Sequence, residues 1–140
     1  MITGINHITL SVREVSESFD FYTEVLGFQP VTCWPKGAYL LAGELWVALL
    51  IDEQVRPGLL PEFTHLAFTV APDAFTAMSE HIRQAGAGIW QENWTEGDSL
   101  YFLDPNGHKL EIHSSDRAAR LKSARENPWE GLVIYDEPER

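Results

Sequence analysis

Two short stretches of the chain alternate between apolar and polar residues in the same way. In the stretch 5–12 apolar residues take every second position, and His7 falls on the opposite, polar face. In the stretch 64–70 the same alternation places His65 on the polar face. A period of two is typical of a half-buried β-strand. The pattern therefore predicts two strands that carry histidines at equivalent positions.

The elements that follow each strand also repeat. After the first strand, apolar residues spaced by three and four predict a helix over 16–26 that ends at Gly27. After the second strand, a helix is predicted over 72–85, with Pro72 near its start and Gly86 at its end. Strands are expected near 29–34, 38–41 and 45–51, and again near 88–91, 99–103 and 109–113.

The chain is thus predicted to be a single α+β domain over 1–140, built from two β-α-β-β-β modules that form a concave mixed sheet. Module one spans about 1–53 and module two about 62–115, with a Pro- and Gly-containing linker over 54–61. A third helix is expected at about 116–125, followed by a tail whose acidic end, 136–140, is expected to fray.

Composition narrows the class of function. The formal net charge is −11, which disfavours nucleic acid and an anionic membrane surface as partners. The lone cysteine, Cys33, excludes an internal disulfide and is expected to be a partly buried small hydrophobe. Because neither a signal peptide nor a stretch of about 20 apolar residues is present, we expect a soluble cytoplasmic protein.

The candidate chemistry is a metal site formed by His7, His65 and Glu111. In the stretch 109–113, Leu110 and Ile112 point toward the helices, so Glu111 points the other way, into the concavity. Two imidazoles and one carboxylate suit a first-row divalent ion, and three protein ligands leave positions open for substrate. His113, on the face of Glu111, is a competing ligand, and His81 and His108 are expected at the surface.

With the repeat and this triad, the sequence resembles the vicinal oxygen chelate superfamily and, within it, the fosfomycin-resistance thiol transferases of the FosA type. The residues that carry the resemblance are GINHITL at 4–10, GAYL at 37–40, Leu45-Trp46, Thr64-His65, and TEGDSLYFLDPNGHKLE at 95–111. Arg120 matches a position in the C-terminal helix. The resemblance extends to about Val133, and the stretch at 95–99 is its most specific part.

The resemblance implies the cofactors and the site. His7, His65 and Glu111 would bind Mn²⁺, and Asn93, Thr95, Gly97 and Ser99 would surround K⁺. The phosphonate of fosfomycin would be held by Thr9, Thr95, Ser99, Tyr101 and Arg120. Tyr39 would help to deprotonate the thiol of the co-substrate glutathione, and Trp46 would wall the pocket. The resemblance also implies a homodimer whose modules complete each site across two chains.

Each of these residues has a simpler reading from the sequence alone. Tyr39, Trp46 and Tyr101 could be core aromatics. Arg120 could lie on a solvated helix face, and the stretch 95–99 could be an ordinary turn. The chain also departs from the family pattern. Gln91 replaces a lysine that pairs with the phosphonate, and Phe63, Ala48 and Trp94 replace a tyrosine, a cysteine and an arginine. These changes predict weaker binding of fosfomycin or a less anionic substrate.

Other functions stay open at this stage. A metal-dependent epoxide hydrolase would need a general base, for which Glu44 is the candidate, although an exposed turn residue is the simpler reading of Glu44. A glyoxalase-type isomerase usually needs four protein ligands, and an extradiol dioxygenase would use the same triad on Fe²⁺. Outside enzymes, the alternative is a binding protein that sequesters a drug in the same groove.

Overall fold

The computed structural model describes residues 1–135, so the acidic tail at 136–140 lies outside the described residues. Module one contains β1 (His7–Val12), α1 (Val15–Asp20), a π-helical turn (Phe21–Val25), β2 (Gln29–Trp34), β3 (Gly37–Ala42) and β4 (Leu45–Ile51). Module two contains β5 (Leu66–Thr69), a 3₁₀ turn (Pro72–Ala74), α2 (Phe75–Gln84), β6 (Ile89–Gln91), β7 (Ser99–Leu103) and β8 (Lys109–His113). The last helix is α3 (Arg117–Glu126).

The predicted elements are all present, and the first helix differs in its winding. Its last turn widens into a π-helix, in which the Leu26 amide donates to the Phe21 carbonyl at 3.1 Å. Gly27 then takes a positive φ of 75°, which ends the helix and lets the Phe28 amide bond back to Tyr22. The turn therefore brings Tyr22 and Phe28 into the core, where both are buried.

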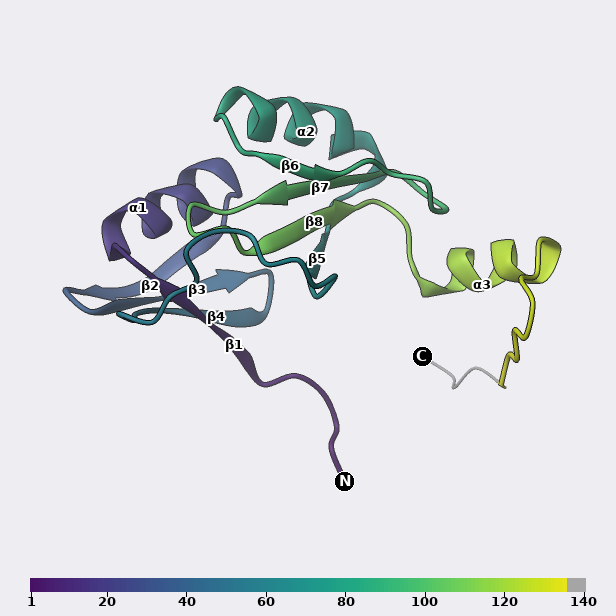
Figure 1. The fold of residues 1–140 in the computed structure, drawn as a ribbon, viewed down its shortest axis with the longest axis horizontal. Coiled ribbons are helices and arrows are strands. Elements are labelled where there is room, and N and C mark those ends of the chain that lie inside the picture. The colour runs from purple at the N-terminus through teal and green to yellow at the C-terminus, as the bar shows by residue number, and fades with distance from the viewer. Residues whose placement is uncertain (136–140) are drawn as a thin grey trace.

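The eight strands form two mixed four-stranded sheets of identical topology, in the orders β1-β4-β3-β2 and β5-β8-β7-β6. In each sheet the first strand pairs in parallel with the last strand of its module, and the other neighbours are antiparallel. The predicted α+β class and the repeat are confirmed. Within the described part of one chain, however, the modules do not join into a single concave sheet (Figure 1).

Both modules contribute to one apolar core. Leu10 and Leu49 come from the first sheet, and Phe102 and Leu110 from the second. Aromatic rings also meet across the modules, because the Phe28 and Phe68 centroids are 5.2 Å apart. Since the apolar face of each sheet is directed into this core, the polar faces that carry His7 and His65 point away from it.

A buried polar turn fastens module two to module one. In the turn between β7 and β8, Asp104 accepts a hydrogen bond of 2.7 Å from the Tyr22 hydroxyl. Asn106 donates to the Ser18 hydroxyl and accepts from the Arg13 amide. Burial, together with the neighbouring Asp104 carboxylate, raises the pKa of Tyr22 well above its usual value. This network replaces part of the apolar contact between the modules with directional bonds.

Two predictions about single residues were wrong. His108 was expected at the surface, but it is buried, because its Nε2 bonds the Ser11 carbonyl across the modules at 2.8 Å. Cys33 was expected to be partly buried, but it is exposed, because every residue of the edge strand β2 is exposed. His81 lies at the surface as expected.

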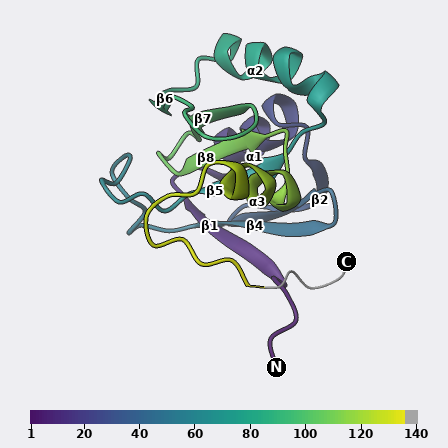
Figure 2. The same ribbon diagram turned by 90° about the vertical axis from the view of Figure 1, so that its right-hand side faces the viewer.

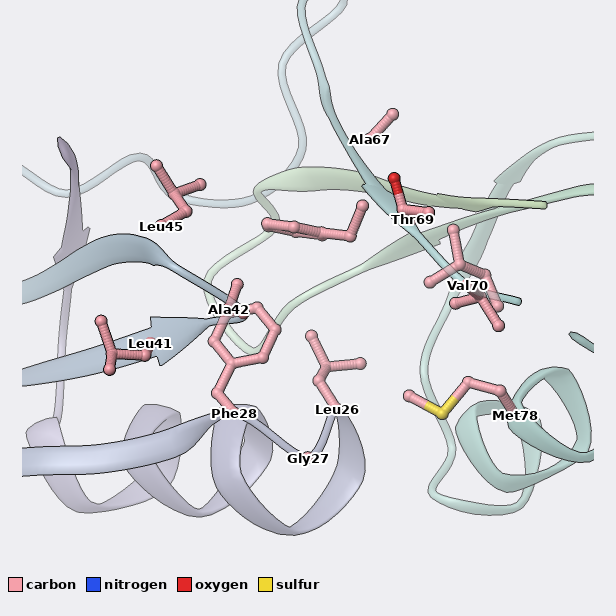
Figure 3. Close-up of a pocket in the computed structure, with 13 residues that line it drawn as sticks. Leu26, Gly27, Phe28, Leu41, Ala42, Leu45, Ala67, Thr69, Val70 and Met78 are labelled. Carbon is pink, nitrogen blue, oxygen red and sulfur yellow. The ribbon is translucent and has the colours of Figure 1, made fainter. Parts of the chain in front are cut away.

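An apolar pocket of about 410 Å³ lies where β5 approaches the turn between β3 and β4 (Figure 3). Phe28, Ala42, Thr69 and Met78 are among the residues that line it. None of its lining residues is ionisable, and none is a predicted site residue. The pocket therefore does not contain the candidate chemistry.

Both ends of the described chain extend away from the sheets (Figures 1 and 2). Residues before β1 form an exposed arm that carries Ile2 and Ile5. Helix α3 stands apart from both sheets, and Trp129 follows it in an exposed position. Among residues 1–135, the structure contains no helix that is long and apolar enough to cross a membrane.

Candidate metal centre and active site

The second module brings together two of the three predicted metal ligands. Glu111 on β8 lies in register with Ala67 on β5, just beyond His65, and with Tyr101 on β7. Glu111 is only 6% exposed, and its carboxylate oxygen Oε1 lies 3.0 Å from His65 Nε2. Its other oxygen, Oε2, accepts a hydrogen bond of 2.7 Å from the Ser99 hydroxyl.

The His65 ring is oriented so that one nitrogen is available to a cation. Its Nδ1 lies 2.8 Å from the Phe63 carbonyl, an acceptor only, so Nδ1 carries a proton. In neutral His65 the Nε2 atom then has a bare lone pair that faces the Glu111 carboxylate. A divalent ion bound by both atoms would satisfy this lone pair and the carboxylate together. An imidazole held through Nδ1–H and directed at a carboxylate is the arrangement that metal-binding histidines adopt, so these residues fit a divalent ion.

The third predicted ligand, His7, lies on the other sheet. Its Nδ1 is 2.7 Å from the amide oxygen of Asn6, which leaves Nε2 as the available atom, as in His65. His7 is exposed and stands at the start of β1. Within residues 1–135 of a single chain, no group of three His, Cys, Asp or Glu side chains is placed to hold a metal ion. One chain therefore presents His7 separately from His65 and Glu111.

Aromatic rings extend from His7 across the first sheet. The His7 and Trp46 centroids are 4.5 Å apart, and Tyr39 follows at 5.0 Å from Trp46. Trp34 on the edge strand β2 lies a further 5.0 Å from Tyr39. The indole N–H of Trp46 is buried without a hydrogen-bond partner. Tyr39 and Trp46 thus belong to the polar face rather than to the shared core, and the exposed Thr9 lies on the same face.

Tyr101 is also outside the shared core, although it is only 4% exposed. Its ring contacts His65 at 6.0 Å and Trp90 at 5.1 Å between centroids. Trp90 was missed by the sequence analysis, because a strand alternation broken by an irregularity between Ile89 and Gln91 does not reveal which way it faces. Its ring contacts those of His65 and Phe63, and Lys109 Nζ lies 5.1 Å from its centroid. The Trp90 ring therefore packs against one side of the candidate metal centre.

The loop predicted to hold K⁺ is folded on itself. The Asn93 side chain donates to the Gly97 carbonyl at 2.8 Å and accepts from the Thr95 hydroxyl at 2.9 Å. Gly97 has a φ of 78°, and a side chain there would meet Ser115 and His113. The loop is therefore held by hydrogen bonds of its own and packs against the end of β8.

Arg120 on α3 reaches this same loop. Its Nε lies 3.6 Å from Glu96 Oε2, and its Nη2 donates to the Glu96 carbonyl at 3.4 Å. Ser115 donates to the other Glu96 oxygen at 2.7 Å. Arg120 is exposed, as a solvated helix face would be, yet it is directed toward the loop that carries Thr95 and Gly97.

The chain belongs to the Glyoxalase/Bleomycin resistance protein/Dioxygenase superfamily, whose pattern residues 4–112 match. Within it, the chain belongs to the family of fosfomycin-resistance enzymes and is an enzyme of the thiol transferase type. It is 47% identical to the glutathione transferase FosA of Serratia marcescens over 136 residues, which cover 96% of each chain. It is 34% identical to the metallothiol transferase FosB of Shouchella clausii, over 98% of this chain and 97% of that one.

Solved structures agree with the sequence relatives. The fold matches a mutant of the fosfomycin resistance protein FosX of Listeria monocytogenes, complexed with Mn(II) and 1S,2S-dihydroxypropylphosphonic acid. That match has a TM-score of 0.76 and 26% identity, and covers 88% of this chain and 98% of the other. FosX of Mesorhizobium loti matches with a TM-score of 0.72 and 27% identity, over 86% of this chain and 99% of that one. The fold and family expected from the sequence are confirmed.

Proposed function

We propose that this protein is a Mn²⁺-dependent glutathione transferase that opens the epoxide of fosfomycin or of a related small epoxide. The observation that carries the proposal is the pair formed by His65 Nε2 and Glu111 Oε1, which face one another at 3.0 Å without a proton when His65 is neutral. That pair occurs in a chain 47% identical to a glutathione transferase.

The proposed site contains His7 from one chain and His65 with Glu111 from another, in a homodimer. Three features support this arrangement. His7 and the pair lie on the polar faces of different sheets, which are directed away from the shared core. No three-ligand group forms within the described part of one chain. The arm before β1, next to His7, carries exposed apolar residues of the kind that interfaces bury.

The reaction would form a C–S bond at an epoxide carbon as the C–O bond breaks, and the alkoxide would then take up a proton. Bound Mn²⁺ would supply Lewis-acid polarisation of the epoxide oxygen. The Tyr39 hydroxyl would hydrogen-bond to the glutathione sulfur and assist loss of the thiol proton to solvent, which would return one proton to the alkoxide. Trp46 would exclude water on one side. We infer a cytoplasmic location, since glutathione and a free cysteine both suit a reducing compartment.

The anionic end of the substrate would be held by donors from both modules, namely Thr9, Thr95, Tyr101 and Arg120. Ser99 would line this end of the site without donating, because its one proton goes to Glu111. Hydroxyls and a guanidinium satisfy a dianion through charge-assisted bonds. The loop of Asn93, Thr95, Gly97 and Ser99 would hold K⁺ beside it through carbonyl and hydroxyl oxygens. Arg120 would have to exchange part of its pairing with Glu96 for the phosphonate.

Gln91 limits how tightly this site would hold a dianion. It lies opposite Tyr101 on the polar face of the second sheet, where it offers a neutral amide. We expect Gln91→Lys to raise kcat/KM for fosfomycin about tenfold, because a charge-assisted bond exceeds a neutral one by ~1–1.5 kcal/mol. Gln91→Glu is the matched control and should lower it. Equal rates for all three proteins would exclude a phosphonate contact at this position.

A product assay tests the reaction directly. Purified protein is incubated with fosfomycin, Mn²⁺ and K⁺, with and without glutathione, and the products are identified by mass spectrometry. A metal-dependent glutathione adduct is the expected result. A diol formed equally well without thiol would assign a hydrolase instead. The hydrolase is the second candidate function because the FosX relative was crystallised with 1S,2S-dihydroxypropylphosphonic acid, which is a diol. Glu44 is exposed in the β3–β4 turn, and this exposure disfavours Glu44 as the general base. Absence of any product together with retained metal would mean that the metal site is right and the proposed substrate is wrong.

Mixing inactive variants tests whether the site is shared. His7→Ala and Glu111→Ala homodimers should each be inactive. In a mixed dimer one site would combine both defects and the other would be intact. Random mixing should then restore about a quarter of wild-type activity. Absence of any recovery, with subunit exchange verified by mass, would show that each site is built from a single chain.

A further inference from the structure

His113 is a histidine for which the proposed reaction has no use. It lies at the end of β8, two residues beyond Glu111 and on the same face. Its Nδ1 is 2.6 Å from the Ser99 hydroxyl oxygen, and that oxygen is 2.7 Å from Glu111 Oε2. The three side chains form a continuous chain of hydrogen bonds that ends on the carboxylate.

The protons available on Ser99 and His113 fix the direction of these hydrogen bonds. A serine hydroxyl has one proton to donate and can accept two bonds, whereas an ionised carboxylate can only accept. The Ser99 proton therefore goes to Glu111, and His113 Nδ1 has to carry the proton that it donates to Ser99. The 3.6 Å separation between His113 Nδ1 and Glu111 Oε2 is too long for a direct bond, so Ser99 links them.

The hydrogen bond from Ser99 also affects Oε1, the other carboxylate oxygen of Glu111. With Oε2 held by Ser99, the carboxylate plane is fixed and Oε1 stays directed at His65 Nε2. These hydrogen bonds from His113 through Ser99 to Glu111, here called the relay, also lie against the predicted K⁺ loop. Gly97 is so close to the His113 ring that a Cβ added to this glycine would be 3.0 Å from it. One imidazole thus couples the orientation of the carboxylate ligand to the position of the loop.

We propose that His113 is a positioning residue, which, through its Nδ1–H and the Ser99 hydroxyl, orients Glu111 for binding the metal ion. This inference rests on the proposed metal site but not on the identity of the substrate. It differs from the expectation that His113 competes as a ligand, because its Nδ1 is directed at Ser99 rather than into the space between His65 and Glu111.

Three substitutions at His113 separate the donor from the ring. An asparagine amide nitrogen can occupy the place of Nδ1, whereas a glutamine amide reaches toward the place of Nε2 and a phenylalanine retains only the ring. We expect His113→Gln and His113→Phe to weaken Mn²⁺ binding about 10- to 100-fold, the range found when the hydrogen-bond partner of a ligand is lost. His113→Asn should bind Mn²⁺ within about threefold of wild type, as expected if the donor is kept.

Mn²⁺ affinity is measured by isothermal titration on the full-length protein without fosfomycin or glutathione. Ser115→Ala is the matched control, since Ser115 packs against the same glycine but bonds Glu96 instead of Glu111. Its Mn²⁺ affinity should not change. If His113→Asn loses affinity as His113→Gln does, ring packing rather than the donor is responsible and the proposal is wrong. Wild-type affinity in all three variants would also overturn it.

Two further measurements keep the proposal testable if a variant is unstable or if the metal does not bind. On a Ser99→Ala background, His113→Gln should cause no additional loss of affinity, because the relay is already cut. In the metal-free wild-type protein, ¹⁵N NMR of the His113 imidazole should report the proton on Nδ1. A bare Nδ1 would reverse the relay and overturn the proposal, whereas absent Mn²⁺ binding with Nδ1 protonated would count against the proposed metal-dependent function alone.

Discussion

The two modules share a topology but differ in the chemistry of their polar faces. At equivalent positions, His7 is exposed and hydrogen-bonds the Asn6 side chain, whereas His65 is partly buried between the Phe63 carbonyl and Glu111. Module one surrounds its histidine with aromatic rings, and module two surrounds its own with a carboxylate and a hydroxyl. A duplicated scaffold can therefore keep its strand register while its two copies specialise in different halves of one site.

The largest expected effect compares the two halves directly. Glu111→Ala removes the only carboxylate of the proposed ligand set and should weaken Mn²⁺ binding by roughly a hundredfold or more, above the range that outer partners give. His7→Ala should cost less at protein concentrations low enough to separate the chains, because the pair of module two binds first. Titration of Mn²⁺ at two protein concentrations measures both effects. If Glu111→Ala and His7→Ala lose the same Mn²⁺ affinity at both protein concentrations, the two modules contribute equally to metal binding.

The second effect concerns how the modules are joined. A side chain at Gly107 would lie 2.5 Å from the Gly58 backbone, and Gly107 has a φ of 84°. Gly107→Ala should lower the free energy of unfolding by about 2–4 kcal/mol, of which ~1–2 come from the positive φ and the rest from overpacking. Gly27→Ala is the control, since Gly27 also has a positive φ but open space around it. For the control, chemical denaturation should give only the ~1–2 kcal/mol of the positive φ. Equal losses in the two variants would exclude a steric role for the linker.

The third effect is a dependence on alkaline pH. The raised pKa of Tyr22 means that the folded protein keeps the phenol proton after the unfolded chain has lost it near pH ~10. Its contribution to stability is therefore complete below that pH and is lost as the pH rises toward the folded pKa. Tyr22→Phe should cost about 1–3 kcal/mol at neutral pH, since Asp104 loses a buried donor.

The loss caused by Tyr22→Phe should shrink above pH ~10, because phenylalanine does not titrate. Thermal unfolding between neutral and alkaline pH checks this sign. A constant difference between the two proteins over that range would mean that Tyr22 does not govern the alkaline decline.

The smallest effect is expected at Glu44. This residue is exposed in the turn between β3 and β4, so Glu44→Gln should leave glutathione transfer within about twofold of wild type, as for most surface changes. The same variant should not reduce any metal-dependent formation of diol. A strong loss of diol formation alone would assign Glu44 a catalytic part and shift the reading of module one from binding toward hydrolysis.

The sequence predicted the elements well because the first strand of each module has a period of two, and because the two module helices are followed by Gly27 and Gly86. It also placed His65 and Glu111 on one face, since neighbouring apolar residues fixed the direction of each strand. His108 was misplaced because its burial depends on Ser11, which is distant along the chain. Trp90 and the relay through His113 were missed for the same reason, as contacts between strands leave no local pattern.

The fit between Gly107 and Gly58 has a consequence for chimeric proteins. The linker lies directly on the turn between β7 and β8, so its path is set by steric contact with a segment far downstream rather than by its own sequence. A recombinant that took its first half from this chain and its second half from a relative would place the linker of one parent against the turn of the other. Crossover designs should therefore move residues 54–61 and 104–108 together, as one inherited unit.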